Sequence, residues 1–459
     1  MMQISLQELQ KAITSSMMGQ NVEVSGLTTD SRKIRQGDLF LALRGEIFDG
    51  HDFLSSVVQT GAAAVVAENV PTGFALPALI VPDTKLALIE IARHWRKKFS
   101  LPVIGVTGSN GKTTVKEMIA AILVAHAGSE RSLSTAGNLN NEIGVPLTVL
   151  CLNANHVCAV IELGMNHPGE IALLASVAMP TVGLVNNAQR EHQEFMQTVQ
   201  AVAEENGAVL SSLPTDGTAV FPFDDIYSSL WRTLATESGQ RKILTFGLNA
   251  SADVSGTFQA NAFGSDMQIS IAGATFSVKL SAAGEHNVLN ALASAACCHA
   301  IGVPNEIIAR GLMAFQPVNG RLQAKQAANG AQIIDDTYNA NPDSVRAAID
   351  VLAQSGDKSI LVLGDMGEVG TEGSAFHQEI GAYARERGIR LLLTLGDLAQ
   401  ESALAFGSGA KHFFTIEEMQ KELDACISPD STALIKGSRF MKMERVVTHL
   451  TQQQFTGTH

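Results

Sequence analysis

The sequence predicts an α/β fold that is divided into three domains. Its 459 residues exceed what a single hydrophobic core usually organises, so more than one domain is expected. The 40 glycines and the low aromatic content of 5% are typical of proteins with many short turns between strands and helices. Apolar runs alternate with helical patterns along the chain, as in the βαβ units that build a parallel sheet.

The first segment, residues 1–85, is expected to form a small α/β domain. Apolar runs at residues 38–43 and 63–67 predict strands between helical patterns. A helix is predicted over residues 86–99, with apolar residues on one side. We interpret the basic side chains on its other side as a solvated face. They are Arg93, Arg96, Lys97 and Lys98.

The same alternation predicts a central domain over residues 86–316 and a third domain over residues 317–459. In the central domain, buried strands are expected at residues 103–106, 157–161 and 181–185. In the third domain, they are expected at residues 332–335, 359–363 and 391–395. Helical stretches lie between these strands, which indicates parallel sheets in both domains.

Composition limits the kinds of partner. The net charge of −13 argues against nucleic acid and anionic membranes, because most of the surface would repel phosphates. The five cysteines are scattered without a C-x-x-C pair, as expected for buried residues of a cytoplasmic protein. No apolar stretch is long enough to insert into a membrane, and no export signal is recognisable. We therefore expect a cytoplasmic protein.

A glycine-rich segment follows the first central strand and precedes a helix-like stretch at residues 115–124. Glycines let backbone N–H groups turn toward phosphates, and a helix N-terminus adds partial positive charge. Lys112 can reach the β- and γ-phosphates of ATP, and the Thr113 hydroxyl can hold Mg²⁺. Val106 stands where the strict P-loop pattern requires glycine, so a simple glycine-rich turn is the alternative. The expected nucleotide-binding residues are Gly108, Ser109, Asn110, Gly111, Lys112, Thr113 and Thr114.

Glu162 follows the predicted strand at residues 157–161. A carboxylate at the carboxyl end of a parallel strand, beside a phosphate loop, is well placed to hold Mg²⁺. The alternative is an ordinary exposed glutamate at a strand end.

The loop T-G-S-N-G-K-T-T at residues 107–114 resembles the phosphate loop of the Mur ligases, and the resemblance extends along essentially the whole chain. The segment D-T-Y-N-A-N-P-D-S at residues 336–344 is similar to the members that add D-alanyl-D-alanine. The D-N-P-R motif of the members that add the preceding residue is absent. The resemblance implies a P-loop ATPase-like central domain with a mostly parallel sheet, a Rossmann-like C-terminal domain and an N-terminal domain that binds the UDP-linked substrate.

The resemblance also implies an activity. The free carboxylate of UDP-N-acetylmuramoyl-tripeptide attacks the γ-phosphate of ATP, and the amine of D-alanyl-D-alanine then attacks the acyl phosphate. This chemistry requires charge neutralisation and positioning more than a protein nucleophile. ATP and Mg²⁺ are the implied cofactors, and we expect a monomer whose C-terminal domain closes on the cleft. The third residue of the tripeptide, diaminopimelate or lysine, stays open.

Individual roles carry over at the positions that match the family's motifs. The implied catalytic residues are Lys112, Glu162, His192 and Arg321. The implied metal ligands are Thr113, Glu162 and His192. Besides the phosphate loop, the nucleotide is expected to contact Asn287, Arg321, Asp335 and Asp336. The substrates are expected to contact Ser31, Arg32, Thr135, Asn138, Asn141, Asn339 and Asn341.

Four of these positions have plainer alternatives. His192 could be a structural histidine, and Asn287 could N-cap a helix. The segment T-D-S-R that contains Ser31 and Arg32 would, in isolation, simply be a turn.

One position departs from the family. Many members carry a carbamylated lysine that helps to hold a second Mg²⁺, and Asn206 stands at that position. Asn cannot form the carbamate. Either one Mg²⁺ suffices, or a nearby carboxylate such as Glu205 replaces the carbamate, or the enzyme is impaired; we expect it to be active. The competing interpretations are a folylpoly-γ-glutamate synthetase and a non-catalytic scaffold derived from a ligase.

Overall fold

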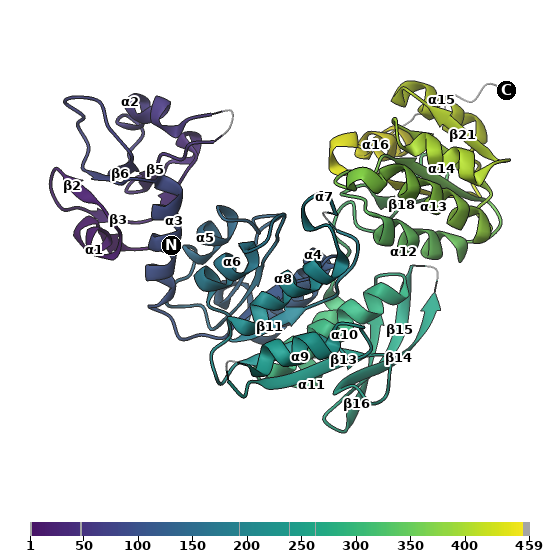
Figure 1. Ribbon diagram of the computed structural model, residues 1–459, viewed down its shortest axis with the longest axis horizontal. Coiled ribbons are helices and arrows are strands. Elements are labelled where there is room, and N and C mark those ends of the chain that lie inside the picture. The colour runs from purple at the N-terminus through teal and green to yellow at the C-terminus, as the bar shows by residue number, and fades with distance from the viewer. Residues whose placement is uncertain (1, 46–47, 192, 238, 262, 453–459) are drawn as a thin grey trace.

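The computed structural model describes residues 2–45, 48–191, 193–237, 239–261 and 263–452 (Figure 1). The described chain forms a five-stranded, a nine-stranded and a six-stranded sheet, with a further two-stranded pair near its start. The three larger sheets follow one another along the sequence, from purple through teal to yellow in Figure 1. The predicted three-part α/β fold is therefore confirmed, whereas the boundaries near residues 85 and 316 stay predictions.

The N-terminal sheet has the order β2-β7-β6-β5-β4. Among the described strands of this sheet, only β2 runs antiparallel to its neighbour. The strands predicted at residues 38–43 and 63–67 are confirmed as β5 and β6. The elements are β1 (Ile4–Ser5), α1 (Leu6–Ala12), β2 (Ser16–Met18), β3 (Glu23–Val24), β4 (Leu27–Thr28), β5 (Leu39–Leu41), α2 (Leu54–Val57), β6 (Ala64–Ala67) and β7 (Ala78–Ile80).

The central sheet has the order β16-β15-β14-β13-β12-β11-β8-β10-β9. Its strands are parallel from β9 to β14, and β15 and β16 add two antiparallel strands that the sequence analysis did not predict. Helices α4, α10 and α11 pack on one face, and α5, α6, α8 and α9 cover the other. Both faces of the parallel strands are therefore buried, which explains their continuous apolar sequences.

The predicted central strands are confirmed as β8, β10 and β11. The strands of this region are β8 (Val103–Thr107), β9 (Ser132–Ser134), β10 (Cys158–Glu162), β11 (Val182–Val185), β12 (Thr218–Pro222), β13 (Lys242–Gly247), β14 (Val254–Asn261), β15 (Gly264–Ile271) and β16 (Ala274–Leu280). The helices are α3 (Thr84–Arg96), α4 (Lys112–Ala127), α5 (Gly144–Val149), α6 (Glu170–Ala178), α7 (Gln193–Met196), α8 (Val199–Ser211), α9 (Ser228–Thr236), α10 (Glu285–Ala300) and α11 (Asn305–Ala314).

The C-terminal sheet has the order β17-β18-β22-β19-β20-β21, and only the edge strand β17 is antiparallel among its described strands. Its two faces carry separate apolar clusters, one under α12 to α14 and one under α15 and α16. The elements are β17 (Gln323–Gln326), β18 (Gln332–Asp336), α12 (Pro342–Ala353), β19 (Ser359–Gly364), α13 (Gly373–Glu386), β20 (Leu391–Leu395), α14 (Ala399–Phe406), β21 (Ala410–Phe413), α15 (Ile416–Cys426), β22 (Thr432–Lys436) and α16 (Glu444–Gln452).

No helix within the described ranges combines the length and the apolar character that crossing a bilayer requires.

The solvated basic face that the sequence analysis expected is confirmed at Lys97 and Lys98, which are exposed, but is wrong for Arg96. Arg96 is only 4% exposed. Its Nε donates to the Ala178 carbonyl at 2.8 Å and its Nη2 donates to the Met179 carbonyl at 3.0 Å, at the end of α6. The last carbonyls of a helix lack partners within the helix. The Arg96 guanidinium supplies hydrogen-bond donors for these carbonyls. The charged hydrogen bonds outweigh the cost of burying the side chain and its charge.

Replacing Arg96 with Met should lower the free energy of unfolding by about 2–4 kcal/mol, because buried carbonyls lose charged donors. The measurement is the shift of the urea-unfolding midpoint. Lys97→Met is the matched control, since Lys97 is the next residue and is exposed. An equal loss in both variants would contradict a special role for the buried guanidinium.

Candidate active site

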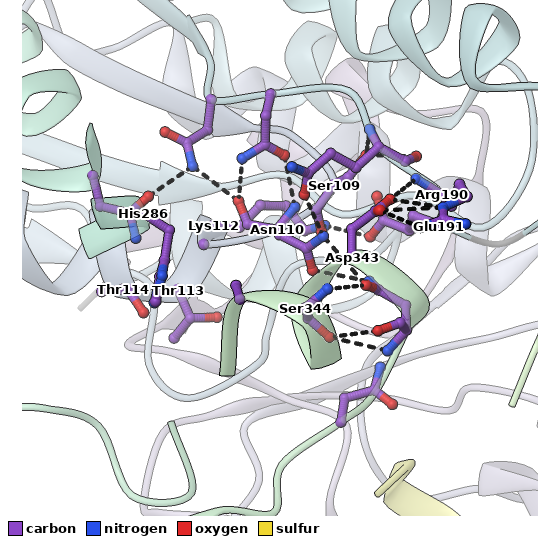
Figure 2. A pocket seen from close by; sticks show the side chains of 18 of the residues that line it. Ser109, Asn110, Lys112, Thr113, Thr114, Arg190, Glu191, His286, Asp343 and Ser344 are labelled. Carbon is purple, nitrogen blue, oxygen red and sulfur yellow. Dashed lines mark hydrogen bonds and ion pairs between the residues drawn. The ribbon is translucent and has the colours of Figure 1, made fainter. Parts of the chain in front are cut away.

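A cavity of about 1050 Å³ opens between the central and C-terminal regions. The phosphate loop (residues 107–114) lies on its floor, where β8 ends and α4 begins. The side chains of the surrounding loops point into the same space (Figure 2). The C-terminal region contributes Arg321, Tyr338, Asn339 and Asn341 to the wall. Two separately folded regions therefore share one site.

Both glycines of the phosphate loop are required by its shape. Gly108 and Gly111 have φ values of 131° and 81°, which side-chain-bearing residues rarely adopt. A Cβ on Gly108 would lie 2.9 Å from the Asn186 side chain, and one on Gly111 would lie 2.6 Å from the Asn290 side chain. The loop can therefore bring its backbone N–H groups and the start of α4 close to a phosphate.

Lys112 is held at the mouth of this loop. Its Nζ donates to the carbonyls of Gly108 at 2.5 Å and Ser109 at 3.0 Å, and to Glu191 Oε1 at 2.6 Å. All three ammonium protons thus have acceptors. A nucleotide phosphate that binds Lys112 has to compete with the Glu191 carboxylate.

Glu162 lies at the end of β10 and is 1% exposed, so the alternative of an exposed strand-end glutamate is wrong. Its Oε1 accepts hydrogen bonds from Thr113 Oγ1 at 3.1 Å and Asn140 Nδ2 at 2.8 Å. Its Oε2 is buried and has no hydrogen-bond partner in the part of the chain that the structure describes. A carboxylate oxygen held in this way beside a hydroxyl fits a hard divalent cation such as Mg²⁺.

The protein side chains around this position form a sparse ligand set. His192, the third expected metal ligand, lies outside the described residues. Across the described ranges, no group of three or more His, Cys, Asp or Glu side chains is arranged to hold a metal. Mg²⁺ commonly binds through one or two carboxylates, substrate phosphates and water. The Thr113 and Glu162 pair matches that mode.

Asn206 supports the phosphate loop. It lies on α8, is 1% exposed, and its Oδ1 accepts the Gly108 N–H at 2.9 Å. Glu205, the suggested replacement for a carbamate, does not line the cavity. Its carboxylate instead accepts the N–H groups of Gly169 and Ile171, each at 2.8 Å, and caps the start of α6. The suggestion for Glu205 is therefore wrong, because the unpaired donors of α6 occupy its carboxylate.

The segment at residues 186–191 was missed by the sequence analysis. It follows β11 and forms hydrogen bonds with the phosphate loop. Asn187 Oδ1 accepts the Asn110 N–H at 2.9 Å, and the Gln189 N–H donates to Ser109 Oγ at 2.9 Å. The detectable signal was a run of polar residues, N-N-A-Q-R-E, directly after a buried strand.

Asn287, which is expected to contact the nucleotide, does not have the alternative role of an N-cap. Gly284, not Asn287, is the N-cap of α10. The Asn287 Nδ2 donates to the Ala283 carbonyl at 2.8 Å, and its Oδ1 accepts from Asn290 at 3.1 Å. Asn287 lines the cavity together with a second set of residues that the sequence did not point to. They are Pro222, Asp224, Asp225, Phe246 and Leu248.

His286 also lines the cavity without having been predicted. Burial lowers its pKa to about 4, so the imidazole is neutral at neutral pH.

The C-terminal residues reach the phosphate loop directly. Arg321 Nη2 donates to Thr113 Oγ1 at 2.9 Å, and its guanidinium lies 4.1 Å from the centre of the Tyr338 ring. Asn341 Nδ2 donates to Asn110 Oδ1 at 2.9 Å. These contacts place a cation and an amide beside the phosphate loop.

Of the two aspartates expected to contact the nucleotide, one lines the cavity and the other does not. Asp336 lines the cavity and accepts a hydrogen bond from Lys436 Nζ at 2.6 Å. Asp335 does not line the cavity, since it is 3% exposed and paired with Lys325 at 2.6 Å.

The other predicted substrate residues are dispersed. Asn141 lines the cavity, and Thr135 is buried behind it, where its hydroxyl accepts the Glu162 N–H at 3.0 Å. Asn138 is exposed and does not line the cavity. Ser31 and Arg32 lie in the N-terminal region, away from the cavity lining, and Arg32 pairs with Asp30 at 2.8 Å.

Comparison with known proteins identifies the architecture that carries this site. Residues 23–95 match the Mur ligase family catalytic domain, 106–298 the Mur ligase middle domain and 320–439 the Mur ligase glutamate ligase domain. The chain is 38% identical over 456 residues to UDP-N-acetylmuramoyl-tripeptide–D-alanyl-D-alanine ligase of Escherichia coli strain K12, which covers 98% of this chain and 99% of that protein. The chain belongs to the Mur ligase family.

Comparison with solved structures agrees with this family assignment. MurF from Acinetobacter baumannii superposes with a TM-score of 0.92 at 34% identity, covering 98% of this chain and 99% of that one. MurF from Thermotoga maritima in complex with ADP gives 0.83 at 28% identity, covering 93% and 97%. A Mycobacterium tuberculosis folylpolyglutamate synthase complexed with ADP gives 0.65 at 16% identity, covering 81% and 94%, which shows a shared fold only.

Replacing Glu191 with Gln should tighten binding of ADP in the absence of Mg²⁺ by about threefold to tenfold, or roughly 0.7–1.4 kcal/mol. The variant removes a negative charge that competes with phosphate for Lys112. Isothermal titration calorimetry measures the change, with exposed Glu194→Gln as the matched control. Weaker ADP binding by Glu191→Gln would contradict the competition.

Proposed function

We propose that this Mur ligase joins D-alanyl-D-alanine to UDP-N-acetylmuramoyl-tripeptide and converts ATP to ADP and phosphate. The observation that carries the proposal is the contact of two side chains from different parts of the fold with one hydroxyl of the phosphate loop. The phosphate loop supplies Thr113, the central sheet supplies Glu162, and the C-terminal region supplies Arg321. The full-length relatives that bear this activity in their names give the substrate pair.

The proposed reaction has two steps in the cavity. The substrate carboxylate attacks the γ-phosphorus, and ADP leaves. The dipeptide amine then attacks the acyl carbon, loses a proton and expels phosphate, which leaves an amide bond. In this proposal Lys112, the N-terminus of α4 and Arg321, which all line the cavity at the phosphate loop, would balance the negative charge that develops during these steps.

Mg²⁺ is part of the proposal. When bound, it would neutralise phosphate charge, and Thr113 and Glu162, with His192 as a further candidate, would hold it. The neutral amides around the cavity, including Asn141, Asn339 and Asn341, can hydrogen-bond peptide groups without adding charge. ATP and the UDP-linked precursor place the reaction in the cytoplasm, and we infer that one chain suffices because both cavity walls come from it.

The two competing interpretations have weaker support. Likeness to folylpolyglutamate synthase is limited to the fold, at 16% identity. The scaffold interpretation depended on Asn206, yet Asn206 Oδ1 holds the Gly108 N–H and so preserves the phosphate loop. We therefore infer an active enzyme.

The activity is tested by coupling ADP release to product detection by mass spectrometry. With ATP, Mg²⁺, UDP-N-acetylmuramoyl-tripeptide and D-alanyl-D-alanine, we expect ADP and the pentapeptide in equal amounts. Lys112→Ala should lower kcat/KM by about 100-fold or more, because charge at the transferring phosphate is unbalanced. Activity with glutamate in place of the dipeptide would favour the folate enzyme, and absence of both products would favour the scaffold.

Replacing Glu162 with Gln should weaken binding of Mg²⁺ with ADP by about tenfold or more, because the variant loses the anionic oxygen that a hard cation prefers. Calorimetric titrations of ADP with and without Mg²⁺ give this difference independently of activity. Binding of ADP alone is the internal control and should change little. An unchanged Mg²⁺ effect would exclude Glu162 as a ligand.

A further inference from the structure

Arg190 makes a charged contact between the two regions that form the cavity. It follows β11 in the central region. Its Nη2 lies 2.6 Å from Asp343 Oδ1 and its Nη1 lies 2.6 Å from Glu379 Oε2. The Arg190 backbone N–H also donates to Asp343 at 2.9 Å. Figure 2 shows the Arg190 side chain directed toward Asp343 at the edge of the cavity.

The C-terminal region itself favours a negative charge at both carboxylates. Asp343 lies in the first turn of α12, where the helix dipole favours a negative charge. Glu379 lies on α13 and is also bound by Arg346 Nη1 at 3.0 Å. The Arg190 guanidinium lies 5.2 Å from the centre of the Phe376 ring. A guanidinium that donates hydrogen bonds to two carboxylates forms a stronger and more directional contact than an isolated surface ion pair.

The side chains are partly shielded from water, with exposed fractions of 23% for Arg190, 22% for Asp343 and 34% for Glu379. Hydrogen bonding to Arg190 also lowers the pKa of Glu379. The contact therefore remains charged at neutral pH and is screened less than an exposed pair.

The segment that carries Arg190 also grips the phosphate loop. Asn187 and Gln189 bind its backbone and Ser109, and Glu191 pairs with Lys112. Arg190 lies between these residues and faces the opposite way, toward α12 and α13. One short segment thus touches the nucleotide site with some side chains and the C-terminal region with another.

The C-terminal groups that enter the cavity depend on how that region is seated. Arg321 reaches Thr113 through one hydrogen bond of 2.9 Å, and the Asn341 and Asn110 amides exchange two hydrogen bonds of 2.9 and 3.3 Å. Asn341 is the N-cap of α12, two residues before Asp343. A shift of α12 away from Arg190 would therefore withdraw Asn341 as well.

We propose that Arg190 is a positioning residue, which seats α12 and α13 against the central region and thereby keeps Arg321 and Asn341 at the phosphate loop. Its kinetic consequences rest on the proposed ligase function. When the seated arrangement is only partly populated, the apparent affinity for a ligand that needs it falls by the seated fraction. Saturating ligand restores the arrangement, so KM changes more than kcat.

The test compares full-length wild type with Arg190→Met, which keeps an unbranched stem but loses the charge. We expect the KM for D-alanyl-D-alanine to rise about tenfold while kcat falls less than about threefold. Small-angle scattering of the nucleotide-free protein should show a larger radius of gyration. Arg190→Lys should bring the KM and the radius of gyration part of the way back to the wild-type values, because it keeps a positive charge.

Arg387→Met is the matched control. Arg387 forms an ion pair with Asp350 at 2.8 Å inside the C-terminal region, so its loss should change neither the KM nor the radius of gyration. Thermal unfolding of all variants establishes that they are folded. Raising NaCl from about 0.05 to 0.5 M should increase the wild-type KM and leave Arg190→Met nearly unaffected, since salt screens the contact.

Two results would overturn the proposal. An unchanged radius and KM in Arg190→Met would show that Arg190 does not seat the C-terminal region. A loss of kcat at constant KM would assign Arg190 to the chemistry instead. If wild type releases no ADP with the named substrates, the proposed function fails, and the scattering comparison of folded variants still decides the seating role.

Discussion

The backbone of the phosphate loop is the constraint around which the site is built. A loop that offers its N–H groups to a ligand cannot pair all of them internally, and any that stay buried need acceptors elsewhere. Asn187 takes the Asn110 N–H, and Asn206 takes the Gly108 N–H. Gly108 and Gly111 have positive φ values, which residues with a side chain rarely adopt, and neighbouring side chains leave no room for a Cβ on either. The neighbouring loops and α8 are therefore shaped by what this backbone requires.

Strand order explains why the cavity residues converge. In the central sheet β8 lies between β10 and β11, and all three run parallel. Their carboxyl ends meet at one edge, where ligands bind in open α/β sheets. The phosphate loop lies at the end of β8, Glu162 is the last residue of β10, and the segment at residues 186–191 follows β11. The site thus follows from topology before any side chain is considered.

Charge is distributed locally and with little excess. The chain carries a net charge of −13, yet the cavity gathers Lys112, Arg321 and a helix N-terminus around the expected phosphates. Glu191 pairs with Lys112, and Asp343 and Glu379 pair with Arg190, so carboxylates balance both cations. A local cationic site of this kind is compatible with a net negative charge on the whole chain.

The sequence by itself determined the local features. The buried parallel strands, the glycine-rich turn and Glu162 at a strand end were readable because each depends on residues close together in the chain. Only the tertiary structure decided the distant pairings: Arg96 on the end of α6, Asn206 on the phosphate loop, and Arg190 on α12 and α13. These contacts join residues separated by tens to hundreds of positions, and no periodicity or spacing encodes such a pairing. The physical reason is that a buried donor or acceptor is satisfied by whichever group the fold brings near it.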